Sequence, residues 1–325
     1  MTHIEAGHLQ IPLTNSARCL GVWWSPNLPS EKSINNNIEK ARRAFFARGS
    51  GVFHSKLNPL SSMNIIEHCV LPCLLYGAES WILNNSLLVK LESFQAELAK
   101  RILCLHRSAA YNVARMALKW PSMRAHILII KLNFLPKTIK GDLSLSARTF
   151  RSLAVSDVES LLLVRQCKFL ESTLKSNFTT SILTSPNCIS FSSIKKNILQ
   201  LDFSLLLSDA TSHPSQTFVH SIASSQEVSW LKLWNLALER GVFGTTCIQA
   251  VLKLLSLHLL SNNMCPVPNC NISLDTRSPC MHFLSHHSEL TISIDELIDA
   301  CVQCSDSLYV YGKSLYRTFK SLWNA

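Results

Sequence analysis

The sequence predicts a mainly α-helical protein, a helical bundle that begins with a short β-hairpin. The 325 residues include only 9 glycines and 12 prolines, fewer than the many tight turns of an all-β sandwich require. Hydrophobic residues make up 47% of the chain, enough for one large core or two domains. Apolar residues also recur at α-helical spacing, most clearly at Leu87, Leu91, Phe94, Leu98 and Ile102.

The first 28 residues are expected to contain the hairpin. Residues 8–12 and 18–24 are two short β-prone stretches, and we expect them to pair through a turn at 13–16. A two-stranded hairpin alone is marginally stable in water. The strands are therefore expected either to lie on the following helices or to belong to a larger sheet.

A basic amphipathic helix is expected after Ser30, which is a favourable N-cap residue. The residues that we expect to bind phosphates are Lys40, Arg42, Arg43 and Arg48 in the helix and Lys56 beyond it. Lys40 and Arg43 share a helix face, whereas Arg42 lies about 100° from Arg43. The alternative is an ordinary amphipathic helix whose charges are solvated.

Residues 61–105 are expected to form a helical hairpin against which neighbouring segments pack. Its two apolar segments are separated by the turn-like pair Asn84-Asn85. Pro72 predicts a kink in the first segment, and Gly77 predicts the close approach of another segment. The second segment ends with two more candidate nucleic-acid-binding residues, Lys100 and Arg101.

Further helices are expected over residues 107–120, 122–135, 158–174, 194–207, 230–240, 251–260 and 292–308. Gly241 is expected to end the helix that precedes it. We therefore divide the chain into the hairpin (1–28), a basic helical domain (29–140), a second helical region (141–262) and a region with a Cys/His cluster and C-terminal helices (263–325).

The positive charge of the chain is concentrated in its N-terminal part. The formal net charge is +10, and residues 1–140 hold 17 Lys and Arg against 7 Asp and Glu, which accounts for the whole excess. Nucleic acid is the commonest polyanionic partner of such a basic region. The alternative is that these charges only keep exposed helix faces soluble.

A cluster of cysteines and histidines near the C-terminus has the spacing of a zinc site, Cys265-x4-Cys270-x11-His282-x3-His286, with His287 as an alternative fourth ligand. Two thiolates and two imidazoles suit tetrahedral Zn²⁺, and four protein ligands would make the zinc structural. A chance arrangement is the alternative, because Cys280 is a competing thiol and the intervening residues lack the apolar anchors of a small finger.

The chain is expected to be intracellular, in the nucleus or the cytoplasm. Its N-terminus shows neither the basic region nor the continuous apolar region of a secretion signal, so we expect the 12 cysteines to be reduced. No apolar run reaches the roughly 18 residues that a membrane-spanning helix requires, and we expect no membrane partner.

A block of distinctive residues lies within the predicted helical hairpin. It consists of Leu71-Pro72, Leu74-Leu75-Tyr76-Gly77-Ala78-Glu79, Trp81, Leu91-Glu92, Gln95 and Lys100-Arg101-Ile102-Leu103. This block resembles one found downstream of the polymerase palm in reverse transcriptases of LINE-type (non-LTR) retrotransposons. Leu20-Gly21-Val22 resembles the turn and strand with which such palms end, with Cys19 where the family commonly has an aromatic residue.

The resemblance implies a C-terminal fragment of such a polymerase, comprising the end of the palm, the helical thumb, a further helical region and a Cys/His knuckle. It implies that the basic thumb binds RNA or an RNA–DNA hybrid. The palm and fingers of the parent polymerase, which this chain lacks, would be its natural partner and would perform the chemistry.

Polymerase chemistry is not expected of this chain alone. A polymerase palm uses Asp carboxylates to hold two Mg²⁺ ions, yet residues 1–141 contain no Asp and no Asp-Asp pair occurs anywhere. We therefore expect no catalytic residues and no Mg²⁺ site here.

Two alternative functions are a helical protein-interaction module with a structural zinc site and a Cys or Ser hydrolase, although the G-x-S-x-G motif of many Ser hydrolases is absent.

Overall fold

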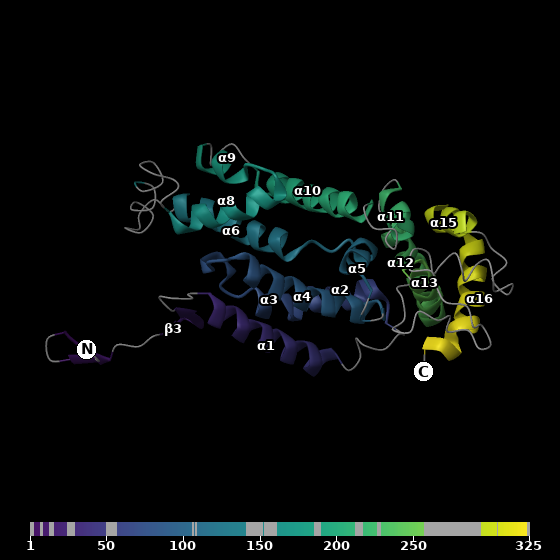
Figure 1. Cartoon of the computed structure of the whole chain (residues 1–325), viewed down its shortest axis with the longest axis horizontal. Helices are drawn as coiled ribbons and strands as arrows, with labels where there is room; N and C mark the ends of the chain where they lie inside the picture. Colours follow the sequence, from purple (N-terminus) through teal and green to yellow (C-terminus); the bar gives the residue numbers. More distant parts are fainter. Residues whose placement is uncertain are drawn as a thin grey trace.

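The computed structural model describes residues 3–6, 9–12, 16–24, 30–49, 57–105, 107, 109–140, 152, 161–184, 190–211, 217–225, 229–256, 294–303 and 305–323. The prediction of a mainly helical protein is confirmed over these residues. Most helices of the first two thirds of the chain lie roughly parallel to the long axis of the molecule and are stacked across it, from α1 at one edge to α10 near the other (Figure 1). The last helices stand across one end of this stack.

Both β-prone stretches contain strands, but their pairing differs from the prediction. Strand β1 (His3–Ala6) pairs with β2 (Leu9–Pro12), and β3 (Ala17–Cys19) pairs with β4 (Val22–Trp24), each pair antiparallel. An antiparallel hairpin at the N-terminus is therefore confirmed, but the predicted pairing of residues 8–12 with residues 18–24 is wrong. The second hairpin closes through Leu20 and Gly21, whose φ angles of 47° and 86° are those of the tight two-residue turns that suit the twist of paired strands.

Helix α1 (Glu31–Gly49) forms where the sequence predicts it, and it buries Ile34, Ala41 and Phe45. Its main neighbours are α3 (Leu71–Leu74), α4 (Asn85–Ile102) and the strand β4. Ser30 stands directly before the helix, and its hydroxyl accepts the backbone N–H of Ile82. The start of α1 is thereby tied to the segment that leads into α4.

The predicted helical hairpin is present, with a break at its expected kink. Helix α2 (Pro59–Cys69) is capped by Val70, and the short α3 follows with Pro72 in its first turn, where the missing N–H of proline is harmless. A 3-10 helix, η1 (Ala78–Ser80), precedes α4. Asn84 caps α4 by accepting the N–H of Leu87. All five apolar residues predicted to face the core from α4 are buried.

The middle of the chain forms α5 (Tyr111–Leu118), α6 (Met123–Lys140), α8 (Leu162–Leu174), α9 (Phe178–Thr184) and α10 (Phe191–Thr211). Helix α8 begins four residues later than the predicted start at 158. Helix α9 lies in a stretch for which we predicted no helix.

The C-terminal part contains α11 (Thr217–Ser224), α12 (Ser229–Glu239), α13 (Gly241–Leu255), α15 (Ile294–Gln303) and α16 (Asp306–Trp323). Gly241 follows α12 as expected, but it also begins α13 with a φ of 70°. The helix that we predicted to start at residue 251 therefore starts at Gly241. The left-handed backbone of Gly241 changes the direction of the chain between α12 and α13, so that no loop is needed there. No helix of the described residues is long and apolar enough to cross a membrane.

Buried polar contacts join the helices on either side of residue 141. The Asp202 carboxylate of α10 accepts hydrogen bonds from the Arg115 guanidinium at 2.7 Å and from the backbone N–H of Ser122 at 2.8 Å. Trp234 donates its indole N–H to the Ala117 carbonyl at 2.8 Å. These contacts tie the predicted first helical domain to the second region, and the division of the chain at residue 141 stays a prediction.

Candidate nucleic-acid interface

The two segments that carry the family resemblance touch each other. The Tyr76 hydroxyl donates to the Leu20 carbonyl at 2.8 Å. A Cβ atom built on Gly77 would lie 2.7 Å from Val22 Cγ2, and one built on Gly21 would lie 3.1 Å from Tyr76 Cε1. Both glycines also have positive φ angles. The contact between the β3–β4 turn and the residues after α3 therefore depends on glycine at both positions.

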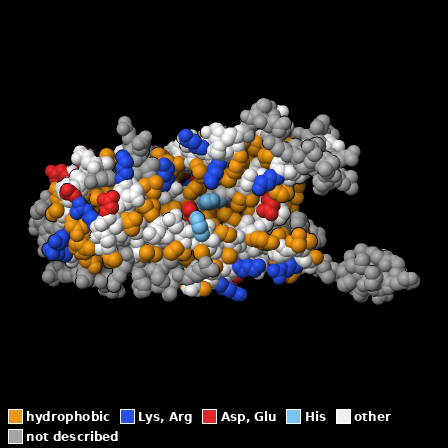
Figure 2. Space-filling model, turned by 180° about the vertical axis from the view of Figure 1, so that it is seen from behind, with side chains coloured by type: hydrophobic (Ala, Val, Ile, Leu, Met, Phe, Trp, Pro, Cys, Tyr) orange, Lys and Arg blue, Asp and Glu red, His pale blue; other side chains and the backbone are white. Residues whose placement is uncertain are grey.

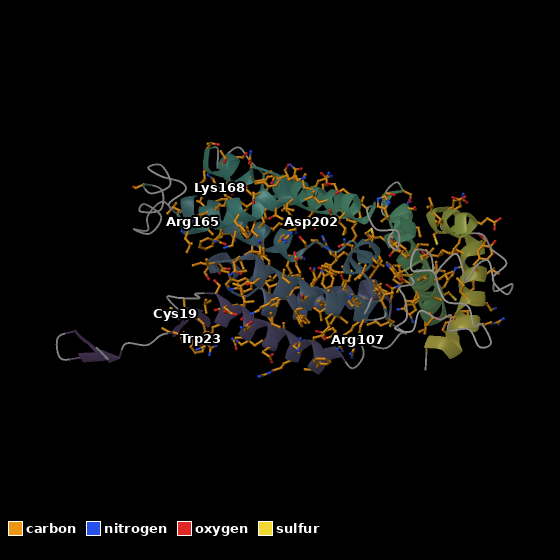
Figure 3. The ribbon with its side chains drawn as sticks, viewed as in Figure 1. Cys19, Trp23, Arg107, Arg165, Lys168 and Asp202 are labelled. Atoms are coloured by element: carbon orange, nitrogen blue, oxygen red, sulfur yellow. The ribbon has the colours of Figure 1, made fainter. Side chains whose placement is uncertain are left out.

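Helix α1 holds both of these segments. Buried Asn37 donates from Nδ2 to the carbonyls of Leu74 and Tyr76, at 3.2 and 2.8 Å. The Ser33 hydroxyl accepts the Trp23 N–H at 2.7 Å and donates to the Trp23 carbonyl at 3.1 Å. Figure 3 shows Cys19 and Trp23 beside the beginning of α1. These bonds fix the turn on the helix that carries most of the predicted phosphate-binding residues.

A first basic pocket lies between the β3–β4 turn, α1 and α3. Its volume is about 370 Å³, and its lining includes Arg18, Lys40, Asn37 and the half-exposed Tyr76. Lys40 is thus the predicted residue that belongs to this pocket. Arg18 was not predicted, because only the docking of the hairpin on α1 brings it close to Lys40.

A second basic cluster lies where α1 meets the C-terminal half of α4. One Glu97 carboxylate oxygen is 3.2 Å from Arg42 of α1, and the other is 2.9 Å from Arg101 of α4. All three side chains reach solvent, with exposed fractions of 46% for Arg42, 39% for Arg101 and 33% for Glu97. We call these three residues the arginine bridge.

Aromatic rings flank both arginines of the bridge. The Arg42 guanidinium lies 5.8 Å from the centroid of the Phe94 ring, and the Arg101 guanidinium lies 5.3 Å from that of Phe46. Both distances allow a cation–π attraction. Phe46 is 48% exposed, so an aromatic face reaches solvent beside the two cations.

The arginine bridge opens into a second basic pocket of about 670 Å³. Its charged lining residues are Glu97, Lys100, Arg101 and Arg107. Lys100 donates to the Arg107 carbonyl at 2.8 Å, and partial burial lowers the pKa of Lys100. Figure 3 places Arg107 far from Cys19 and Trp23 along α1, so the two basic pockets are separate.

The remaining predicted residues are only partly placed. Arg43 is exposed on α1. Arg48 belongs to α1, but its side chain lies outside the described part, as does all of Lys56. Figure 2 shows Lys and Arg side chains along the lower edge of the molecule, where α1 lies. Glu97 and Arg107 were not among the predicted residues of the interface. Glu97 could have been found from its position four residues before Arg101 on one helix, because residues at this spacing form ion pairs.

The predicted zinc ligands Cys265, Cys270, His282 and His286 lie outside the described residues. Within the described ranges, no group of three or more His, Cys, Asp or Glu residues is arranged to hold a metal ion. The zinc site therefore stays a prediction.

Three described cysteines lack the activation that a nucleophile requires. Burial raises the pKa of Cys167 to about 12 and that of Cys247 to about 11, and it also raises the pKa of Cys104. Catalytic cysteines show the opposite shift, because the thiolate is the reactive form. These three thiols give no support to the hydrolase alternative.

No protein-family model, curated protein or solved structure matches this chain. Its function is therefore inferred from the residues of the two basic pockets and from the contacts that position them.

Proposed function

We propose that this chain is the thumb and downstream part of a LINE-type reverse transcriptase, and that it binds RNA or an RNA–DNA hybrid through α1 and the end of α4. The observation that carries the proposal is the convergence of cations from two helices, exposed Arg42 from α1 and exposed Arg101 and half-buried Lys100 from α4, beside the exposed ring of Phe46.

The chemistry of this surface suits a nucleic-acid backbone. Guanidinium and ammonium groups neutralise phosphates without reading the bases, so we expect binding with little sequence preference. Exposed rings such as Phe46 and Tyr76 offer faces on which bases stack. The family proposal has separate support, since Leu20-Gly21-Val22 and Tyr76-Gly77 resemble the family and contact each other.

We assign binding and not polymerisation to this region. The Asp carboxylates that hold Mg²⁺ in a polymerase palm are absent from residues 1–141. We include a structural zinc ion at Cys265, Cys270, His282 and His286 in the proposal, on the strength of their spacing.

A titration of the whole chain with a labelled RNA–DNA hybrid, at 50 and 200 mM salt, tests the proposed binding. The variant carries Arg42→Ala and Arg43→Ala on α1. The matched control carries Arg165→Ala and Lys196→Ala, which remove the same charge from exposed positions of α8 and α10. Figures 1 and 3 show these helices and Arg165 on the edge opposite α1.

We expect the wild-type affinity to fall steeply between the two salt concentrations, and the α1 variant to reduce the slope of log K against log salt by about 2. The control variant should keep the wild-type slope. Binding that is absent or independent of salt would refute the proposal and favour the protein-interaction alternative. Equal losses in both variants would show that only the net charge matters.

A further inference from the structure

The arginine bridge contains an anion in a position where a nucleic-acid phosphate would be expected. The Glu97 carboxylate joins the guanidinium of Arg42, from α1, to that of Arg101, from α4, through two different oxygens. Two guanidiniums repel each other, and the carboxylate that both contact offsets this repulsion. A phosphate also presents several oxygens, and it accepts hydrogen bonds from paired arginines as a carboxylate does.

We propose that the arginine bridge is a phosphate-binding site of the nucleic-acid interface, which Glu97 occupies when no nucleic acid is bound. A backbone phosphate then displaces the Glu97 carboxylate and takes its place between Arg42 and Arg101. This inference rests on the proposed function, since it names the site where the bound strand replaces an internal anion.

Glu97 is held weakly enough to be displaced. All three side chains of the bridge are between 33% and 46% exposed. Ion pairs at such positions contribute little to stability, because water screens the charges and the long side chains lose rotamer freedom. The second basic pocket opens beside Glu97, so its side chain has space on the solvent side.

The two arginines have other contacts that hold them when Glu97 leaves. The guanidinium of Arg42 lies against Phe94, and that of Arg101 lies against Phe46. These cation–π contacts do not involve Glu97. The binding site therefore keeps its two cations in position during the exchange of one anion for another.

The surroundings favour an incoming phosphate strand. The pocket of about 670 Å³ beside the bridge is lined by Lys100, Arg101 and Arg107, and Glu97 is the acidic residue among its described lining residues. Once Glu97 has moved away, the cations of this pocket and Arg42 face the same strand. Neighbouring phosphates of that strand can then be neutralised along the end of α4.

The test is the affinity of Glu97→Gln for the RNA–DNA hybrid. Glutamine keeps the size of the side chain and removes the charge that competes with phosphate. We expect affinity at low salt to rise about fivefold, the equivalent of two exposed ion pairs that no longer need to be broken. The slope of log K against log salt should steepen by about 1.

The matched control is Glu39→Gln, which removes one negative charge from an exposed position of the neighbouring helix α1. We expect its affinity to stay within about twofold of the wild type. An equal gain in both variants would mean general charge attraction and would overturn the site. Weaker binding by Glu97→Gln would also overturn it, because Glu97 would then orient the arginines for the ligand.

These outcomes separate this inference from the proposed function. Salt-dependent binding by the wild type without a gain in Glu97→Gln refutes the phosphate site and leaves the interface in place. Absence of binding in the wild type and in both variants refutes the site and the function together. Thermal unfolding of each variant, followed by circular dichroism, confirms that the compared proteins are folded.

Discussion

The contact between Gly77 and the β3–β4 turn allows a quantitative prediction for Gly77→Ala. The new methyl group would lie 2.7 Å from Val22 Cγ2, at a backbone φ of 75°. Placing a non-glycine residue in this left-handed region costs about 1–2 kcal/mol. Overpacking by one methyl group adds about 1–3 kcal/mol. The reduced freedom of the unfolded chain offsets about 0.4–1 kcal/mol, so we expect a net destabilisation of about 1–4.5 kcal/mol, with a midpoint of about 3 kcal/mol.

Gly241→Ala provides the matched control for this prediction. Gly241 has a similar φ of 70°, but no heavy atom lies within 4 Å of the position that its Cβ would take. At Gly241 only the backbone strain and the reduced freedom of the unfolded chain apply. We expect the free energy of unfolding to fall by about 1 kcal/mol. The difference between the two variants isolates the contact with Val22.

Urea unfolding measures both variants as changes in the free energy of unfolding, with unchanged m-values as the check on two-state behaviour. Val22→Ala removes the clashing methyl group, so it should restore part of the loss in a Gly77→Ala background. Equal destabilisation by Gly77→Ala and Gly241→Ala, with no rescue by Val22→Ala, would show that the β3–β4 turn does not pack on Gly77.

Two further predictions concern pH and metal. Burial lowers the pKa of His126 from 6.5 to about 4. As the pH falls, His126 therefore binds a proton in the unfolded chain before it does so in the folded chain. We expect the free energy of unfolding to fall by about 2–3 kcal/mol as the pH drops from 6.5 to 4. His126→Gln should lack this part of the loss, and parallel pH curves for the two proteins would contradict the assignment. Purified protein should contain one zinc ion per chain, whereas Cys265→Ser with Cys270→Ser should contain none; metal analysis that finds equal zinc in both would refute the site.

Most helix positions were predictable because they depend on local spacing, although α9 was not predicted and α13 starts earlier than expected. The α4 pattern of apolar residues and the Asn84 cap are both readable from neighbouring residues, and the structure has the predicted buried face. Strand pairing was predicted wrongly because the two short stretches are compatible with more than one partner. The turn at Leu20-Gly21 decided the second pair, and it requires positive φ at a leucine, which sequence pattern alone does not favour.

The sequence predicted most of the basic residues of the candidate interface, but it did not predict which of them lie together. Lys40, Arg42 and Arg43 were predicted as one set on α1, whereas Lys40 lies in the pocket with Arg18 and Arg42 bonds to Glu97. Glu97 is 55 residues from Arg42 in the chain. A residue at that distance comes into contact only through the packing of α1 on α4.

The sequence by itself determined the helical class and the concentration of positive charge before residue 141, since both follow from composition and periodicity. It also supplied the residues on which the proposed relation to LINE-type reverse transcriptases rests. Only the tertiary structure decided that two of these segments meet at Gly21 and Gly77, and that Arg42 and Arg101 share one carboxylate. The physical reason is that local spacing fixes which face of a helix is apolar, whereas the packing of one helix on another fixes which exposed charges become neighbours.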